Sequence, residues 1–498
     1  MYPAKFWMVY ERFIRKAAGL GRSPMQLDPD SYDKLNQHTD ILVVGAGPSG
    51  MLAAREAART GARVIIVDEQ NEFGGSLLAS TQTIDGVKAS SWVKNLMAEL
   101  TKNKNVLMLP RSTAFGFYDH NFVAVIERRT DHLGDSASGL CRERIHRVRA
   151  KQIILATGAL ERPLVFAHND IPGVMLASSV SNYLIRYGVA PGNRLLLFTT
   201  NDNAYQTAID WYQSGREVVA IVDSRRNLSG AMYEAARELG IEVKSGHAVI
   251  EAEGGKRVCS ARVASLSRQG NKIDSLVEKL DCDLIACSGG WSPTIHLSSH
   301  TGSKPVWNES ISGFVSGSSR EDLLLVGACN GEYSLTGCLA NGAEIGCRAA
   351  ESAGYQISAM EPPRFQVEEF EELPQQTIFL VPHDKGTSRA PSSFVDMQLD
   401  VTADSIEIAV REGFESIEHI KRYTALGFGT DQGKLSNVNG IGILAQILGR
   451  RISEIGTTVF RPAYTPTTFG AIAGRDVGAL FDPERLTAIH RWHEENGA

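Results

Sequence analysis

The sequence predicts an α/β protein with two Rossmann-like domains and a small, mostly helical C-terminal module. Three observations predict this fold: a complete strand–glycine turn–helix–strand unit at residues 40–70, a second strand–helix–strand pattern at 194–223, and helical periodicity after residue 393. The chain has 498 residues, of which 43% are hydrophobic and 22% are charged. This length and composition are typical of a globular protein with two or three domains.

The glycine-rich unit contains each part that a dinucleotide-binding βαβ unit requires. An apolar strand at 41–44 runs into the turn GAGPSG at 45–50, and an alanine-rich helix follows. The next strand, at 63–67, ends in the acidic triplet DEQ at 68–70, about 20 residues past the glycines. A glycine-rich turn in an unrelated α/β fold is the alternative, but such a turn would not need the complete pattern.

Each glycine of this turn has a separate physical role. Gly45 allows the tight turn, Gly47 lets a diphosphate approach the backbone because it has no Cβ, and Gly50 lets helix and strand pack closely. The helix N-terminus adds free N–H groups and a positive dipole end for the phosphates. Asp68 or Glu69 can accept hydrogen bonds from a ribose diol, and the carboxylate would repel a 2′-phosphate.

Two further segments are expected beside the nucleotide. The loop GGS at 74–76 can lie along it, although a plain turn is the alternative. The apolar strand QIILATG at 152–158 ends in small residues, which in flavoproteins with two dinucleotide domains pass close to the nucleotide; a buried strand with a glycine exit is the alternative. The predicted nucleotide-binding residues are Gly45, Ala46, Gly47, Ser49, Gly50, Asp68, Glu69, Gln70, Gly75, Ser76, Ala114, Thr157, Gly158 and Thr336.

The second unit lacks a phosphate-binding turn. Its strand at 194–198 is followed by TTNDN at 199–203, which contains no glycine. Asp202 would repel a phosphate, and Asn or Asp at this position makes a good helix N-cap. We therefore expect a Rossmann scaffold without a dinucleotide.

The strand LLLVG at 323–327 is predicted to return to the first domain. Relatives that bind FAD usually carry Gly-Asp here, whereas this chain has Gly327-Ala328, which favours a different nucleotide such as NAD. The predicted organisation is a lead-in at 1–39, a dinucleotide-binding domain at 40–174 and 323–354, a second Rossmann-like domain at 175–322, a helical module at 393–475 and a tail at 476–498.

The helical module carries a candidate anion pocket for a flavin phosphate. Its glycine-rich loop GFGTDQGK spans 427–434 and follows a predicted helix at 417–423. Cationic and hydroxyl side chains at such a loop suit a phosphate, but a solvated basic face is the alternative. The candidate residues are Lys421, Arg422, Thr424, Thr430, Gln432 and Lys434.

Composition excludes several other classes of protein. The net charge of −6 gives no indication of nucleic-acid or anionic-membrane binding, and no apolar run approaches 18 residues. Seven cysteines without a CxxC motif fit reduced thiols in the cytoplasm rather than a disulfide framework or a metal site. The redox-active CxxxxC of disulfide reductases is also absent: the corresponding stretch at 71–78 reads NEFGGSLL.

The chain resembles the alpha subunit of heterotetrameric sarcosine oxidase over nearly its whole length. Long motifs carry the resemblance, namely FIRKAAGLG at 13–21, ATGALERPLVF at 156–166, CSGGWSPTIHL at 287–297, the segment at 394–434 and FRPAYTPTTFGAIAGR at 460–475, together with GAGPSG and VDEQ. The resemblance implies a fold of two FAD/NAD-binding, disulfide-reductase-like domains that holds NAD, without a catalytic residue in this chain.

The resemblance also implies partners. In that family FAD and substrate lie in the beta subunit, FMN lies at the interface between alpha and beta subunits, and gamma and delta subunits complete the complex. Sarcosine or a related N-methyl amino acid is oxidised at FAD, and electrons pass through FMN to oxygen to give peroxide. The candidate pocket of the helical module would then border FMN.

Family alpha subunits begin with a small β-rich domain and end with a folate-binding aminomethyltransferase domain. This sequence starts after the first and stops about where the second would begin, so we expect a short form or a fragment that does not bind tetrahydrofolate. Two other readings stay open: a self-contained FAD-dependent NAD(P)H oxidoreductase, and a non-catalytic scaffold stabilised by its nucleotide.

Overall fold

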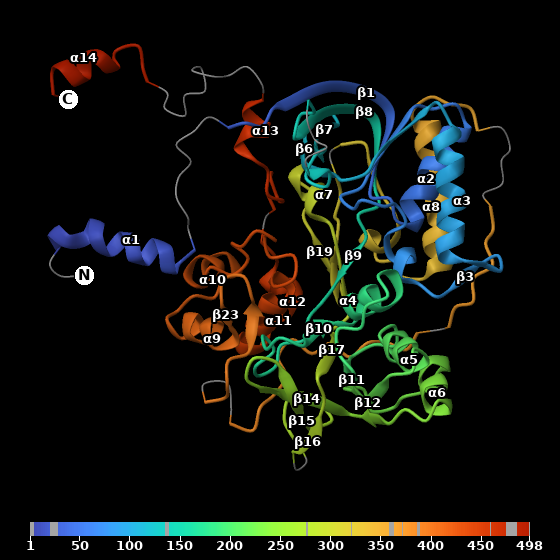
Figure 1. Ribbon diagram of the computed structural model, residues 1–498, viewed down its shortest axis with the longest axis vertical. Coiled ribbons are helices and arrows are strands. Elements are labelled where there is room, and N and C mark those ends of the chain that lie inside the picture. The colour runs from blue at the N-terminus through green and yellow to red at the C-terminus, as the bar shows by residue number, and fades with distance from the viewer. Residues whose placement is uncertain are drawn as a thin grey trace.

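We describe the protein from a computed structural model (Figure 1). The described residues are 4–19, 28–134, 139–274, 277–319, 321–357, 363–370, 372–385, 389–458, 460–474 and 486–497. Parts of the predicted tail at 476–498 and of the segment between the predicted domains at 355–392 lie outside these ranges, as do the ends of the motifs at 13–21 and 460–475.

The first sheet combines a parallel half and an antiparallel half around one long strand pair. β1 runs parallel to β8 over almost the full length of both, and β21 continues the parallel half on the far side of β8. The strand order is β5-β2-β1-β8-β7-β6. The bounds are β1 Tyr32–Val44, β2 Val64–Val67, β5 Val106–Leu109, β6 Ser112–Tyr118, β7 Phe122–Arg128, β8 Glu143–Leu155 and β21 Leu323–Leu325.

The start of β1 corrects the end of the predicted lead-in at 1–39, because residues 32–39 belong to the first sheet. Residues 32–39 are polar, and they form a strand because they pair residue by residue with 143–150 of β8. Asp33 and Arg144 also form an ion pair across the two strands at 3.4 Å. A polar strand with a distant polar partner has no apolar alternation for sequence analysis to detect.

Three helices cover one face of the parallel half: α2 (Pro48–Arg59), α3 (Ala89–Lys102) and α8 (Leu335–Ser352) (Figure 1). α2 and α8 are in close contact because α8 has glycines on its facing side. A Cβ atom on Gly342 would lie 2.5 Å from the carbonyl oxygen of Ser49, and one on Gly346 would lie 2.4 Å from that of Ala53. The two helices therefore run in the same direction, side by side.

The second sheet is parallel throughout, with the order β10-β17-β11-β12-β13. Short helices cover one face, and an antiparallel sheet of β14, β15 and β16 lies beside it. The bounds are β10 Val174–Leu176, α4 Ala177–Ser181, β11 Arg194–Thr199, α5 Tyr205–Gln213, β12 Glu217–Asp223, α6 Ala231–Glu238, β13 Val243–Ser245, β14 His247–Gly254, β15 Val258–Ser265, β16 Glu278–Asp281 and β17 Leu284–Ser288.

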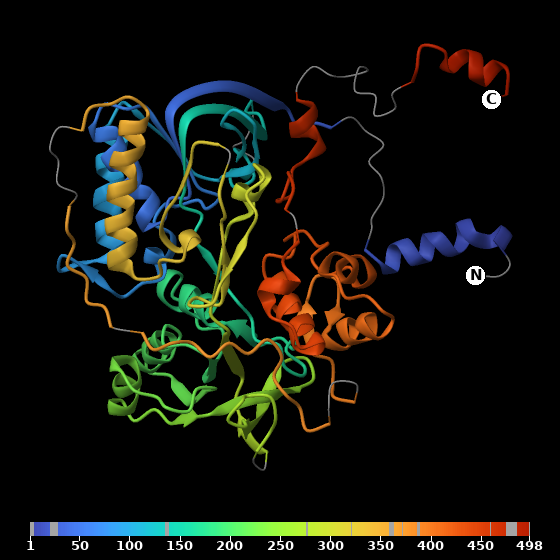
Figure 2. The same cartoon turned by 180° about the vertical axis from the view of Figure 1, so that it is seen from behind.

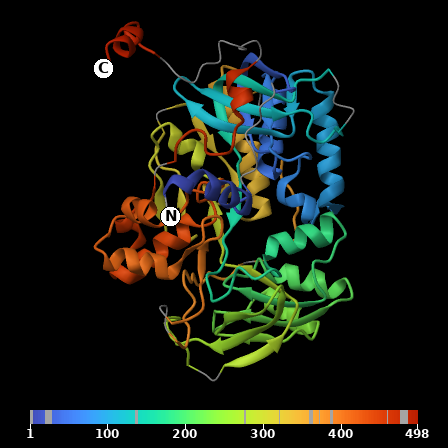
Figure 3. The same ribbon diagram turned by 60° about the vertical axis from the view of Figure 1, so that its left-hand side comes forward.

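The C-terminal module packs helices around its own apolar core, beside both sheets (Figures 2 and 3). Its elements are β22 Phe394–Asp396, β23 Val401–Thr402, α9 Ala403–Arg411, α10 Ile417–Thr424, α11 Asn437–Leu448 and α12 Ile452–Ile455. α13 (Phe469–Ala473) packs instead on β1 and β8 of the first sheet (Figure 1). The predicted α/β class, with two Rossmann-like sheets and a helical module, is confirmed. The exact domain boundaries stay predictions.

The remaining elements are short or lie at the termini. They are η1 Ala4–Phe6, α1 Trp7–Ala17, η2 Gly75–Ala79, β3 Thr83–Ile84, β4 Val87–Lys88, β9 Ala159–Glu161, η4 Asn182–Arg186, β18 Trp291–Pro293, α7 His296–His300, β19 Val306–Asn308, β20 Gly313–Val315, η5 Gly327–Asn330 and α14 His490–Glu495. Among the helices of the described ranges, none has the length and apolarity needed to span a membrane.

The close approach of α2 and α8 gives a first prediction. Gly346→Leu should destabilise the protein by about 1–3 kcal/mol, because the new side chain must push the helices apart. Chemical unfolding should show a lower denaturant midpoint. Gly255→Leu is the matched control, since a Cβ there would meet nothing within 4 Å. Equal midpoints for the two variants would contradict the proposed packing.

Candidate nucleotide-binding site

The glycine turn between β1 and α2 is shaped by two crowded glycines and one open glycine. Gly45 has a φ of +101°, and a Cβ there would lie 2.2 Å from the carbonyl oxygen of Ala156. A Cβ on Gly50 would lie 1.9 Å from the carbonyl oxygen of Gly45. A Cβ on Gly47 would meet nothing within 4 Å. The backbone at Gly47 is therefore open to an approaching diphosphate.

Asp68 ties the end of β2 to this turn. Its Oδ2 accepts a hydrogen bond from the N–H of Ala46 at 2.7 Å, and its Oδ1 accepts one from the N–H of Gln70 at 2.8 Å. Burial raises the pKa of Asp68, and the two backbone N–H groups oppose that rise. Glu69 is exposed and has no such bonds among the described contacts. Asp68 thus holds the turn, and Glu69 is the carboxylate left facing outward.

A polar cavity of about 310 Å³ lies next to Glu69. It was not predicted, because its residues come from separate segments with no common motif. Arg186 fixes one side of it by donating to the Oε1 of Gln70 at 2.8 Å and pairing with Glu72 at 3.0 Å. The lining residues are Glu69, Gln70, Asn71, Arg111, Arg128, Asp131, His132 and Tyr187.

Five other predicted residues make structural contacts near the turn or within the first sheet. A Cβ on Gly75 would lie 2.8 Å from the Cα of Gly47, so the loop with Ser76 packs directly on the glycine turn. Thr157 donates from Oγ1 to the carbonyl of Thr294 at 2.6 Å, and Gly158 accepts from the N–H of Thr294 at 2.9 Å. Ala114 is buried within β6, paired with Val125.

Thr336 lies in the first turn of α8, where its N–H is already taken. It donates to both carboxylate oxygens of Glu369 at 3.1 Å. Sequence analysis missed Glu369, because it lies between residues 354 and 393, outside the predicted domains. No local signal connects it to a helix that begins 34 residues earlier.

In the second Rossmann-like sheet, an ionic network lies where the first sheet has its glycine turn and the acid after its second strand. Arg225 pairs with Asp202 at 2.6 Å and with Asp223 at 2.7 Å, and the hydroxyl of Tyr205 donates to Asp223 at 2.8 Å. Asp202 also accepts from the N–H of Leu373 at 2.6 Å. These four side chains are buried, so this end of the sheet presents neither a glycine turn nor a free acid.

The six residues of the candidate flavin-phosphate pocket do not share one arrangement. Arg422 pairs with Glu418 at 2.8 Å within α10. Thr424 donates to the carbonyl of Ile420 at 2.8 Å, Thr430 to Gln398 at 3.2 Å, and Gln432 to the carbonyl of Gly429 at 3.0 Å. These bonds stabilise the module itself.

Lys421 and Lys434 differ from the other four. Burial lowers the pKa of each amine, and within the described ranges neither has a carboxylate at ion-pair distance. Lys434 donates to the carbonyl of Tyr464 at 3.2 Å and lies 4.5 Å from the centre of its ring. Arg461 lowers the pKa of Lys421 further. Glu418 acts on Lys421, and Glu69 and Asp431 act on Lys434, only from beyond ion-pair distance. Two half-buried amines without a direct ion pair among the described residues are suited to an anionic ligand.

Two histidines of α7, His296 and His300, lie against Tyr464. The ring of His296 is stacked on Tyr464 with centroids 5.5 Å apart and lies 4.1 Å from that of Phe460. His300 accepts from the N–H of Phe117 at 3.3 Å. Burial lowers the pKa of His296 to about 3 and that of His300 to about 4, so both are neutral at physiological pH.

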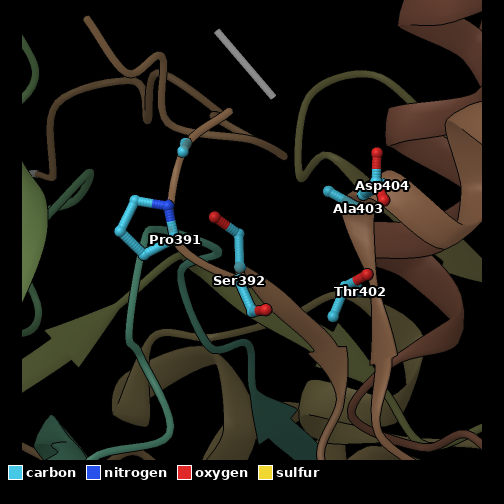
Figure 4. A pocket seen from close by; sticks show the side chains of 7 residues that line it. Pro391, Ser392, Thr402, Ala403 and Asp404 are labelled. Atoms are coloured by element: carbon cyan, nitrogen blue, oxygen red, sulfur yellow. The ribbon is translucent and has the colours of Figure 1, made fainter. Parts of the chain in front are cut away.

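A small hollow of about 80 Å³ lies elsewhere, where β23 meets the start of α9 (Figure 4). Ser392, Thr402 and Asp404 contribute its polar groups. Thr402 is already engaged as the cap of α9, since its hydroxyl accepts from the N–H of Ser405 at 3.2 Å. The hollow is too small for a nucleotide, and the glycine turn remains the better candidate.

The buried histidines predict a pH dependence of stability. The unfolded chain takes up protons below about pH 6.5, whereas folded His296 and His300 do not until about pH 3 and 4. Their stabilisation is therefore complete above pH 6.5 and is lost as pH falls. His296→Asn should reduce the loss of unfolding free energy between pH 6.5 and 5 by about 2 kcal/mol.

Denaturant unfolding at several pH values measures this difference. His120→Asn is the control, because His120 is exposed and its φ of +60° suits asparagine. A His296→Asn variant that loses as much stability on acidification as the parent would contradict a neutral, buried His296.

Comparison with known proteins identifies the parts of this fold. Residues 39–312 match the pyridine nucleotide-disulphide oxidoreductase family, and residues 390–475 match the sarcosine oxidase A3 domain. L-Proline dehydrogenase from P. horikoshii, a solved structure, shares the fold with a TM-score of 0.66 and 19% identity, covering 91% of this chain and 82% of its own.

Curated relatives extend the match to almost the whole chain. It is 42% identical to the sarcosine oxidase subunit alpha of Corynebacterium sp. strain P-1 over 96% of this chain and 50% of that protein. It is also 42% identical to the subunit of the same name from Rhizobium meliloti, over 100% of this chain and 49% of that protein.

The chain thus spans about half the length of the curated relatives it matches. The resemblance predicted from the sequence motifs is confirmed. The chain belongs to the pyridine nucleotide-disulphide oxidoreductase family, and nearly its whole length is similar to sarcosine oxidase alpha subunits.

Proposed function

We propose that this chain is the nucleotide-carrying, alpha-type subunit of a heteromeric FAD/FMN amine oxidase that demethylates sarcosine or a related N-methyl amino acid. One contrast carries the proposal: the first Rossmann-like sheet has an open glycine turn, and the second has its position filled by the Arg225 network. Such a chain has no second nucleotide with which to pass a hydride, so the oxidation belongs to a partner subunit.

The nucleotide in the first cleft is NAD in this proposal. Residues of the glycine turn and the N-terminus of α2 would hold the diphosphate, and the exposed Glu69 would accept from the ribose hydroxyls. NAD supplies a nicotinamide ring that can accept a hydride; here we propose that it stabilises the cleft rather than reacts. The motif Gly327-Ala328 lacks the acid that FAD-binding relatives use, which supports NAD.

FMN is proposed to lie between the helical module and a beta-type partner, with FAD and substrate inside that partner. The half-buried amines of Lys421 and Lys434 support a phosphate at this surface. The complete complex would include gamma and delta subunits as a heterotetramer, with peroxide as product. We propose that it works in the cytoplasm, which the seven unpaired cysteines favour.

A self-contained FAD-dependent NAD(P)H oxidoreductase is the main alternative. It requires a second phosphate-binding turn, where Asp202 lies in a buried network instead. The two proposals differ in colour: the chain purified alone should be nearly colourless if its nucleotide is NAD, and yellow if it is FAD. Mass spectrometry of the nucleotide extracted from the chain distinguishes them directly.

Substitution of the open glycine tests the nucleotide site. Gly47→Val should lower the amount of NAD bound to the purified chain at least tenfold, because the new side chain fills the space meant for the diphosphate. The fold should survive, since a Cβ at Gly47 meets nothing within 4 Å. Gly255→Val is the control. Unchanged NAD content in Gly47→Val would contradict the site.

The amines of the module give a separate prediction for the complex. Co-expression with a beta-type partner should yield sarcosine-dependent peroxide. The double variant Lys421→Met, Lys434→Met should retain NAD but lose most FMN, because the phosphate loses both cationic contacts. Lys94→Met, which removes an exposed lysine of α3, is the control. Full FMN retention in the double variant would place the flavin elsewhere.

A further inference from the structure

Two parallel helices of the first domain present N-termini of different character. α2 begins at Pro48 after the open Gly47, with no acidic residue in its first turn. α8 runs beside it in the same direction, as the Gly342–Ser49 and Gly346–Ala53 approaches require. The N-terminus of α2 can therefore accept an anion. Whether the N-terminus of α8 has free N–H groups decides which charge the other half of a bound dinucleotide would face.

The first turn of α8 has no free donor. The N–H groups of Leu335 and Thr336 both donate to the carboxylate of Glu369. The N–H of Gly337 donates to the hydroxyl of Ser334 at 3.1 Å, and that of Cys338 to the carbonyl of Ser334 at 2.9 Å. Glu369 thus satisfies and neutralises a helix end that would otherwise attract an anion.

The segment that carries Glu369 is fixed in place. Val367 forms a β-bridge with Ile84, and the ring of Phe365 packs edge-on against Trp92 at 6.0 Å. Asp85 and Gln366 exchange two hydrogen bonds of 2.8 Å. Figure 2 shows the chain after α8 running down past the helices and then across to the module. Glu369 is therefore held firmly at the start of α8.

The order of strands indicates which part of a dinucleotide faces α8. Glu69 follows β2, the glycine turn follows β1, and α8 follows β21, which lies beyond β8 on the other side of β1. A dinucleotide with one ribose at Glu69 and its diphosphate at the glycine turn therefore extends its other half toward the start of α8. Gly342 of α8 lies beside Ser49 of α2, and α8 begins seven residues before Gly342. The N-terminus of α8 therefore projects about 10 Å beyond Ser49 along the helix axis.

We propose that Glu369 is a specificity-determining residue of the first cleft: its carboxylate excludes a redox-active flavin and favours NAD⁺ over NADH. This inference rests on the proposed binding of NAD. A reduced flavin ring carries negative charge, which a free helix N-terminus stabilises and a carboxylate repels. The nicotinamide ring of NAD⁺ is cationic and that of NADH is neutral, so the same carboxylate attracts only the oxidised form.

Binding measurements on the full chain test the inference. Nucleotide-free protein is titrated with NAD⁺, NADH and FAD. The parent should bind NAD⁺ roughly tenfold more tightly than NADH, which corresponds to a lowering of the potential of the bound couple by about 30 mV. Glu369→Gln, which keeps an oxygen acceptor for the helix, should bring this ratio close to one. Glu368→Gln, one residue away and exposed, should leave the ratio unchanged.

The outcomes separate this inference from the proposed function. If the parent binds neither NAD⁺ nor NADH, the proposed function fails. If the parent binds both equally, or if Glu369→Gln keeps the tenfold ratio, the role of Glu369 is overturned while NAD binding stands. The ratio in the parent needs no variant, so the test remains decisive even if Glu369→Gln does not fold. Binding of FAD by the parent as tightly as NAD⁺ would also overturn it.

Discussion

The nucleotide cleft depends on one carboxylate that serves two backbone donors. Asp68 stands at the end of β2, and its hydrogen bonds to Ala46 and Gln70 fix the glycine turn relative to that strand. Both bonds run from neutral N–H groups to a partly buried carboxylate, which makes them stronger than bonds between neutral groups. The bond from the N–H of Gln70 to Asp68 also fixes the backbone on both sides of Glu69, which keeps the Glu69 side chain exposed. The openness at Gly47 and the exposed acid are thus two consequences of one anchored side chain.

The second Rossmann-like sheet uses the same position for a different purpose. Asp223 ends β12 as Asp68 follows β2, but its charge is met by Arg225 in the loop after β12 and by Tyr205 of α5. A buried carboxylate must have such partners, and removing one of them leaves a charge without compensation. The network therefore keeps the scaffold stable while it occupies the space of a ligand. The same strand–helix–strand topology therefore appears twice in this chain, once with an open glycine turn and once with side chains of the chain itself in that position.

Much of this arrangement could be predicted from sequence, because its signals are local. The strand, glycine turn, helix and acid fall within 31 consecutive residues, and the missing glycine at 199–203 is equally local. The contributions of Glu369 and Arg225 could not be predicted, since each pairs with a residue that only the fold brings near. The polar start of β1 was missed for the same reason. The candidate flavin pocket was predicted as one cluster, whereas four of its residues bond within the module and the amines of Lys421 and Lys434 form no ion pair among the described residues.

The cleft and the helical module are connected electrostatically. Burial lowers the pKa of Lys434 and raises that of Tyr464, and the charge of Glu69 opposes the first shift and adds to the second. These three groups therefore lie within range of one another although they come from different parts of the chain. Lys434 is half-buried, and desolvation opposes its charge. A diphosphate at the glycine turn would add negative charge to the same region and thereby favour the protonated amine. In our proposal, a nucleotide bound at the glycine turn would therefore act on the charge of Lys434, which links the cleft electrostatically to the module.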